Sequence, residues 1–360
     1  MEITSKSQSL IEFIFQKYET LLTYRVSDTY FMKLLYVLLS KAEESVAKLK
    51  IHHAPVKGVN VSNTFVLPKE IVDYLTDVSM DHYIVQMIIH EIVFDIEIYT
   101  KEPLGQMLRL IQVVLSLCAK DAPLDHYGIT FYMTPFKKEL QGTVTPMDVN
   151  TGFTKGNQVV LFRKEEWLKV FIHECFHLFC LDFHEIDVDY KAMLQPMFRV
   201  NSKYMMIEPF CEFWARTLNT ALFSYWIKKN ISYEEFERYF HMNLNLERAF
   251  GLVQMKHYLS HFNLDYTNLV TTKETPTYTE STEGFSYYVL TPILFFHFQQ
   301  TMNWFVDHNE TLLHFKRNTR HVHLFCHYLK SIYAQDKFLK QLDLVKEYPE
   351  SWYMSIFEGS

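Results

Sequence analysis

The sequence predicts an α+β protein that is predominantly helical and contains one small, mostly antiparallel sheet. Apolar residues recur at helical spacing over most of the 360 residues. Four of the nine glycines lie between residues 128 and 156, where they predict turns between short strands. Directly after that stretch, an apolar helical segment carries the residues His173-Glu-Cys-Phe-His177. The first two observations set the fold class, and the third points to chemistry.

Residues 1–122 are expected to form a helical N-terminal region, and residues 123–360 a catalytic region with a helical C-terminal extension. Within the first region, apolar periodicity predicts two helices in residues 9–50. The segment 56–67 has the pattern of an extended chain. Further helices are predicted at EIVDYL and at about residues 80–99 and 104–119, the last two being apolar on more than one face and therefore buried.

After Pro123 the pattern changes to short strands. GITFYMT predicts one strand, and DVNTGFT and QVVLFR predict two more that form a hairpin around Lys155-Gly156-Asn157. The sheet is expected to be confined to about residues 125–163. The hairpin leads into the apolar helical segment 164–184, in which Lys164, Glu165 and Glu166 form a start with an excess of acidic residues. An exposed edge strand of such a sheet can hold an extended peptide through main-chain hydrogen bonds.

The remainder of the chain has helical patterns. Pro209 suits the first turn of a helix that continues to about residue 226. Ser232 and Glu235 form a capping box before the next helix. A polar loop is predicted at 271–283, followed by aromatic-rich helices at 286–306 and 320–345.

Composition excludes several classes of function and partner. The net charge is −7, and no stretch gathers enough Lys and Arg to bind a nucleic-acid backbone. The five cysteines are scattered, which is typical of thiols in a reducing compartment and predicts a cytoplasmic protein. The N-terminal residues have no secretion signal, and no apolar stretch reaches the length of a membrane span.

The His173–His177 motif has the spacing of a zinc site. Two histidines four residues apart lie on one face of a helix, so their imidazoles can bind one zinc ion. Glu174 then lies beside the metal, where it can act as general base towards the water that zinc activates. Because ionisable groups in an apolar helix are costly unless they are paired, we favour zinc over a chance match or a structural histidine pair.

The sequence offers three candidates for a third zinc ligand. Glu208 and Glu212 are one helical turn apart on an otherwise apolar helix. Glu212 is favoured as the ligand, with Glu208 as its alternative or as the residue that orients a ligating histidine. His184 would need the chain to reverse between Leu178 and Phe183, where no glycine eases that reversal.

HECFH followed about 30 residues later by an E-x-x-x-E helix resembles the gluzincin clan of zinc metallopeptidases. The resemblance covers roughly residues 125–220 and implies a zincin-like core. It implies that His173, His177 and Glu212 bind zinc and that Glu174 is the general base. The clan often has an acidic residue where this chain has Arg216. A zinc-dependent peptidase is therefore expected, and a catalytically inactive zincin-fold scaffold or virion structural protein is the alternative.

Other features of the sequence give weaker indications of function. The hairpin and following helix, with the later SYYVL, are similar to uncharacterised proteins of large double-stranded DNA viruses, which implies association with a virion. Gluzincins usually add a Tyr or His that stabilises the oxyanion, for which Tyr287, Tyr288 and His297 are candidates. His321, His323 and His327 cluster near the C-terminus. His323 and His327 have helical spacing and could bind a second metal, but histidines so spaced are more often ordinary surface or partly buried helix residues. His90-Glu91 repeats the HE dipeptide without a second histidine and is interpreted as structural.

Overall fold

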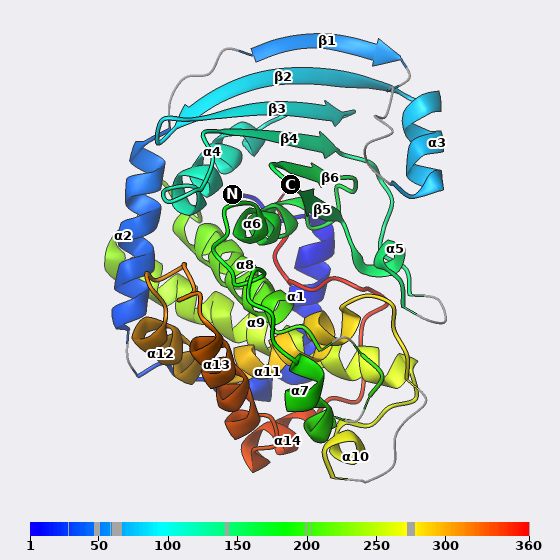
Figure 1. Ribbon diagram of the computed structural model, residues 1–360, viewed down its shortest axis with the longest axis vertical. Coiled ribbons are helices and arrows are strands. Elements are labelled where there is room, and N and C mark those ends of the chain that lie inside the picture. The colour runs from blue at the N-terminus through cyan, green and yellow to red at the C-terminus, as the bar shows by residue number, and fades with distance from the viewer. Residues whose placement is uncertain are drawn as a thin grey trace. The chain divides into compact units, whose positions relative to one another are not determined.

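The structure is a computed structural model that describes residues 1–27, 29–46, 51–57, 59, 67–140, 144–198, 200–202, 204–271 and 278–359 (Figure 1). Helix accounts for about 53% of it, which confirms a predominantly helical α+β fold. The chain divides into two compact units. We call residues 1–36, 139–149 and 182–360 the helical unit, and residues 37–138 and 150–181 the sheet unit.

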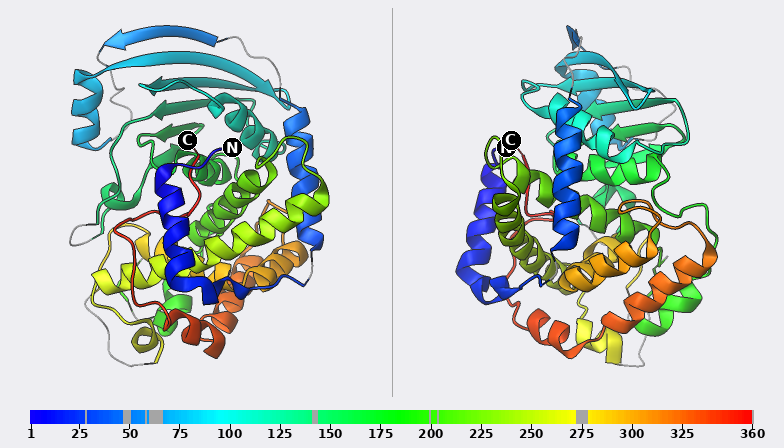
Figure 2. Two further views of the ribbon diagram at one scale, coloured as in Figure 1. Left: turned by 180° about the vertical axis from the view of Figure 1, so that it is seen from behind. Right: turned by 90° about the vertical axis from the view of Figure 1, so that its left-hand side faces the viewer.

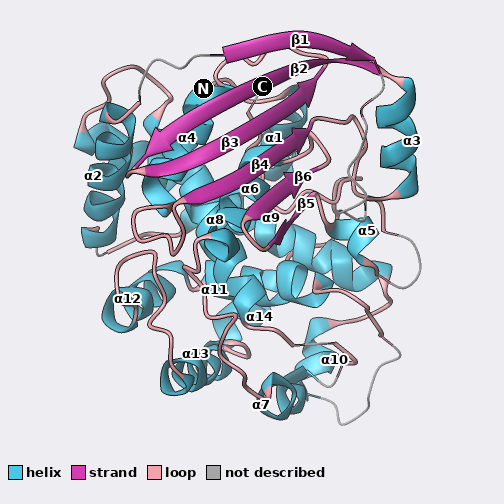
Figure 3. Cartoon of the chain, turned by 45° about the horizontal axis from the view of Figure 1, so that its top comes forward, coloured by secondary structure: helices cyan, strands magenta, loops and turns pink. Residues whose placement is uncertain are grey.

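The sheet unit contains a six-stranded mixed sheet with the strand order β1-β2-β3-β4-β6-β5, so β1 and β5 are its edges (Figure 3). β4 runs parallel to β3 and β6, and the other neighbours are antiparallel. The sheet is thus larger than the 125–163 segment predicted from the sequence. Its strands are β1 (Ile51–Lys57), β2 (Ser79–Ile89), β3 (Ile92–Thr100), β4 (His126–Tyr132), β5 (Gly152–Lys155) and β6 (Gln158–Leu161).

The predicted helix at 80–99 is wrong, because this segment forms the antiparallel pair β2–β3. His90 and Glu91 make the two-residue turn between the strands, with φ angles of 52° and 66°. Such left-handed pairs are typical of hairpin turns that match the strand twist. The segment is rich in Ile and Val, which favour strands, and its apolar residues on both faces were misread as those of a buried helix. The predicted extended segment 56–67 overlaps β1, but residues 58 and 60–66 lie outside the described residues.

Helices α4 (Met107–Cys118) and α6 (Trp167–Leu178) cover one face of the sheet (Figure 1). Phe131 on this face packs edge-on against Trp167 and Phe171 of α6, at centroid distances of 5.9 and 5.2 Å. One end of the opposite face is covered by α3 (Lys69–Asp77), whose buried side chains join an apolar cluster with Tyr99 and Tyr132. The predicted helices at EIVDYL and 104–119 are therefore confirmed.

The hairpin β5–β6 forms where the sequence predicted it. Gly156 has a φ of +61°, which a residue with a side chain rarely adopts, and it lies in the turn. Gly152 is needed for a different reason, since a Cβ there would lie 2.8 Å from the carbonyl oxygen of Val160. Both glycines keep β5 paired closely with β6, which places β5 against α6.

The helical unit contains α1 (Ser5–Tyr18), η1 (Glu19–Thr23), α5 (Pro146–Val149), α7 (Tyr190–Phe198), α8 (Ile207–Tyr225), α9 (Tyr233–His261), α10 (Tyr266–Thr271), η2 (Ser286–Leu290), α11 (Thr291–Phe296), α12 (Phe298–His308), α13 (Thr319–Ile332) and α14 (Asp336–Leu342). The division between the units falls within α2 (Tyr30–Glu44). The predicted capping box is confirmed, because Ser232 Oγ accepts from Glu235 N and Glu235 Oε2 accepts from Ser232 N. In the predicted loop 271–283, residues 272–277 lie outside the described residues.

α8 and α9 pack against each other in the helical unit (Figure 2, green and yellow-green). A buried ion pair joins them, with Arg216 Nε 2.5 Å from Glu247 Oε1. Glu247 Oε2 also accepts the N–H of Ile356 at 2.9 Å. Burial raises the pKa of Glu247, while the Arg216 guanidinium opposes that shift. The residue that departs from the gluzincin pattern, Arg216, thus connects α8 to the rest of its own unit.

Candidate metal and acid–base site

α6 begins at a tightly held point. Glu166, the residue before the helix, has a left-handed φ of 54°, and its carboxylate forms a fully buried ion pair with the Lys138 ammonium group. Glu165 Oε2 accepts the main-chain N–H of Lys138 at 2.7 Å. The acidic helix start predicted from the sequence is therefore an internal anchor rather than a solvated first turn. It fixes the start of α6 against the segment that follows β4.

α6 ends in a reversal that the sequence did not predict. Cys180 has a φ of 52°, Cys180 N donates to His177 O at 3.1 Å, and Leu181 N donates to Phe176 O at 2.9 Å. These two bonds around a left-handed residue form a Schellman motif. The expectation that the chain needs a glycine to reverse here is wrong, since a cysteine takes the glycine's place. Further along, His184 Nδ1 lies 2.6 Å from Asp182 Oδ1, and the His184 side chain is 44% exposed.

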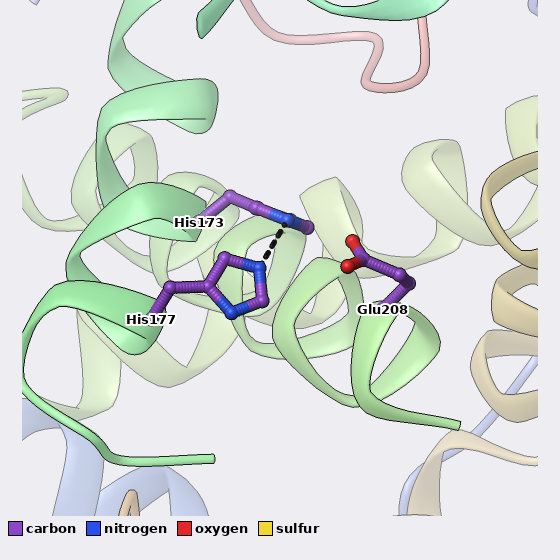
Figure 4. Close-up of side chains that lie close together, drawn as sticks. All are labelled: His173, His177 and Glu208. Carbon is purple, nitrogen blue, oxygen red and sulfur yellow. Dashed lines mark hydrogen bonds between the residues drawn. The ribbon is translucent and has the colours of Figure 1, made fainter. Parts of the chain in front are cut away.

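His173 and His177 lie on successive turns of α6 with their imidazoles facing each other (Figure 4). Their Nε2 atoms are 3.1 Å apart, and the ring planes are inclined by 67°. Two nitrogens bound to one tetrahedral zinc at about 2.05 Å would be about 3.3 Å apart, so the observed separation fits two ligands of one ion. His173 is only 5% exposed. The pair could therefore supply two ligands to one metal ion within a mostly buried helix.

Glu174 is held from the edge strand of the sheet. Thr154 Oγ1 on β5 donates to Glu174 Oε2 at 2.7 Å and lies 3.2 Å from the Glu174 carbonyl oxygen. The Glu174 residue is 7% exposed, so its carboxylate lies in a mostly buried setting. Sequence reasoning named Glu174 but missed Thr154. The signal available was the proximity of the hairpin to the motif helix along the chain.

The two candidate carboxylates lie one turn apart on α8 in the helical unit. Glu208 is in the first turn, and its Oε2 accepts a hydrogen bond from Tyr287 Oη at 2.8 Å. Glu212 is 1% exposed and lies in the interior of the same helix. Tyr287 belongs to η2, a π-helical turn whose Ser286 Oγ donates to Met205 O, just before α8, at 3.1 Å. π-Helical turns occur frequently at functional sites.

The other predicted residues have structural surroundings. Tyr288 Oη donates to Trp352 O at 2.6 Å, and the pKa of His297 is lowered to about 4, chiefly by burial. His323 and His327 are exposed on α13. His321 Nδ1 lies 2.8 Å from the side chain of Asn318, which caps that helix. None of these contacts resembles the arrangement on α6.

No family model, curated protein or solved structure matches this chain. Among the described residues, no helix is both long and apolar enough to cross a membrane.

Proposed function

We propose that this protein is a zinc-dependent peptidase. The observation that carries the proposal is the 3.1 Å approach of His173 Nε2 and His177 Nε2, with the carboxylate of Glu174 on the same helix. Two convergent imidazoles and an adjacent carboxylate supply two zinc ligands and a base, which is the combination that metal-assisted hydrolysis of a peptide requires. The resemblance of HECFH to gluzincins implies the same roles.

His173 and His177 are two of the zinc ligands that we propose, and the third is a carboxylate of α8, as the E-x-x-x-E pattern of the sequence predicts. The sequence favoured Glu212 for the third position, but one hydrogen bond and a difference in burial, both within the helical unit, favour Glu208. Its carboxylate is hydrogen-bonded by Tyr287, as ligating carboxylates commonly are by a neighbour. It is also less buried than Glu212, which suits a site that must admit water and substrate.

Glu174 is the general base of the proposed reaction. When bound, zinc lowers the pKa of a coordinated water to about 7 and polarises the scissile carbonyl. The Glu174 carboxylate accepts the proton of the attacking water and then donates it to the nitrogen of the departing amine. His173 and His177 are neutral ligands in this scheme, so each keeps its Nε2 lone pair for the metal.

An extended peptide is the substrate class that the edge strand β5 fits. Phe162 N donates to Thr151 O at 2.9 Å, which marks this pair as hydrogen-bonded in the β5–β6 ladder. Because hydrogen-bonded and non-bonded pairs alternate between antiparallel strands, the main-chain groups of Gly152 and Thr154 point away from β6. A peptide that pairs with them would lie alongside the strand whose Thr154 contacts Glu174.

The test is hydrolysis of a mixed peptide library by zinc-loaded protein, with cleavage products identified by mass spectrometry. Glu174→Gln is expected to retain zinc and lose about 10²–10⁴-fold in turnover, the usual contribution of a positioned base. Glu91→Gln is the matched control, because Glu91 follows a histidine in the β2–β3 turn and should leave turnover unchanged. Zinc binding without any hydrolysis by the wild-type protein would overturn the proposal in favour of the inactive scaffold.

A further inference from the structure

Thr154 is the side chain that connects the edge of the sheet to the proposed general base. It lies on β5 opposite Val159, on the face of the sheet that α6 covers. Its hydroxyl has one proton and two acceptors within reach, Glu174 Oε2 at 2.7 Å and the Glu174 carbonyl oxygen at 3.2 Å. The carboxylate is the closer and, when ionised, the stronger acceptor, so the hydroxyl donates its hydrogen bond to Glu174 Oε2.

The two partners of this bond differ in rigidity. Threonine is β-branched, and a strand holds both its main chain and its χ1 angle, so the hydroxyl occupies a fixed point. Glutamate has three rotatable side-chain bonds, and its carboxylate can otherwise take several orientations. A fixed donor that holds a flexible acceptor reduces the orientations open to that acceptor. The bond therefore selects one position for the Glu174 carboxylate.

Thr154 also carries main-chain groups at the open edge of β5, because Thr154 and Val159 form a non-hydrogen-bonded pair. We infer that Thr154 is a positioning residue for Glu174, and that it couples pairing of an extended substrate at the edge strand to the orientation of the base. The inference rests on the proposed peptidase function. A substrate strand paired with the Thr154 main chain would restrain the same residue whose hydroxyl holds the carboxylate.

A purely structural role for Thr154 predicts something different. If the hydroxyl only tied the hairpin to α6, its loss would loosen the unit, and the loss of turnover would not depend on Glu174. If it positions the base, its effect requires the Glu174 carboxylate. The two roles are separable by removing the hydroxyl in the presence and absence of that carboxylate.

The experiment compares Thr154→Val, which keeps the β-branched shape without the hydroxyl, with Thr154→Ser, which keeps the hydroxyl. We expect Thr154→Val to lower kcat about 10-fold with little change in KM and unchanged zinc content, and Thr154→Ser to restore most of kcat. In a Glu174→Gln background, Thr154→Val should cause no further loss. Thr130→Val is the matched control, since Thr130 lies on β4 one residue from Phe131 and therefore faces away from α6.

A second readout is independent of activity. Crystal structures of the two variants should show the Glu174 carboxylate displaced in Thr154→Val and in its original position in Thr154→Ser. An undisplaced carboxylate with unchanged kcat in Thr154→Val would overturn the inference, as would an equal loss of kcat in Thr154→Ser. If Thr154→Val does not fold, Thr154→Ala takes its place in both measurements. Failure of the wild-type protein to hydrolyse any peptide would instead overturn the peptidase proposal, while the carboxylate positions would still decide whether Thr154 orients Glu174.

Discussion

Among the described residues, α6, α9 and α13 each carry two histidines four residues apart, and the surroundings of the α6 pair differ most clearly from those of the α13 pair. His173 and His177 on α6 are buried to half-buried, and their Nε2 atoms approach to 3.1 Å. His323 and His327 on α13 have the same spacing but are exposed to solvent. Spacing alone lets two imidazoles share one helical face. What differs on α6 is a costly burial that a metal would offset, together with an adjacent carboxylate held from β5.

The largest expected effect is on zinc affinity, and it tests this comparison directly. His173→Ala should weaken zinc binding by more than about 100-fold, because it removes a ligand. Loss of a residue that only hydrogen-bonds a ligand typically costs about 10–100-fold. His323→Ala removes a histidine of identical spacing and should leave the affinity unchanged. Competition titration with a chelator measures both. Equal losses in the two variants would show that burial does not distinguish the pairs.

A second prediction extends the comparison from α6 to the carboxylates of α8. Glu208→Ala should cause the larger loss of zinc affinity, and Glu212→Ala the smaller. Tyr287→Phe, which removes only the hydrogen bond to Glu208, should cost about 10-fold. The same chelator competition applies. A larger loss in Glu212→Ala than in Glu208→Ala would restore the ligand that the sequence favoured.

Glu280 shows how this protein accommodates a buried carboxyl group through hydrogen bonds and a raised pKa. It is 8% exposed, and burial raises its pKa to about 7, although Ser202, Phe285 and Tyr278 donate hydrogen bonds to it. Below about pH 7 this carboxyl group can therefore remain buried in its protonated, neutral form. The burial of His173 alone therefore does not indicate zinc, and the zinc site is inferred from this burial together with the convergence of His173 on His177.

The smallest expected effect is on the pH dependence of stability, and it tests whether Glu280 has a raised pKa in the folded protein. The pKa of Glu280 is about 7 in the folded state against 4.5 for a free carboxyl, so the folded state binds more protons between these values. Its contribution to stability is therefore full below about pH 4.5 and is lost as the pH rises to about 7, a change of about 3 kcal/mol. We expect the free energy of unfolding of the metal-free protein, measured with denaturant, to fall less from pH 5 to pH 7 in Glu280→Gln than in the wild-type protein. An equal fall in the wild-type protein and in Glu280→Gln would contradict the raised pKa.

Local pattern was sufficient to predict much of this fold. The β5–β6 hairpin has turn residues at its tip, the capping box lies in four consecutive residues, and the HECFH spacing fixes one helical face. The β2–β3 pair was missed because β2 carries apolar residues on both faces, which obscures its alternation, and because the alternation over residues 94–98 of β3 was overlooked beside it. Its turn was missed because it contains neither the Gly nor the Asn that usually marks such a turn, and Glu91 is an unusual residue for a left-handed φ angle.

The contacts around the site depend on tertiary structure and could not be predicted in the same way. Thr154 contacts Glu174 from 20 residues away, and Tyr287 contacts Glu208 from 79 residues away. Neither pair has a spacing that a single element would impose. The reversal at Cys180 was missed for another reason, since non-glycine residues adopt that conformation only when the surrounding bonds compensate for the strain.

X-ray absorption at the zinc edge tests the proposed metal centre most directly. Protein loaded with one equivalent of zinc should show four nitrogen or oxygen neighbours at about 2.0–2.2 Å, with the outer-shell scattering of two imidazoles. His173→Ala should lose one imidazole contribution or the metal altogether. A sulfur neighbour at about 2.3 Å would contradict the account, because it would assign a cysteine as a zinc ligand.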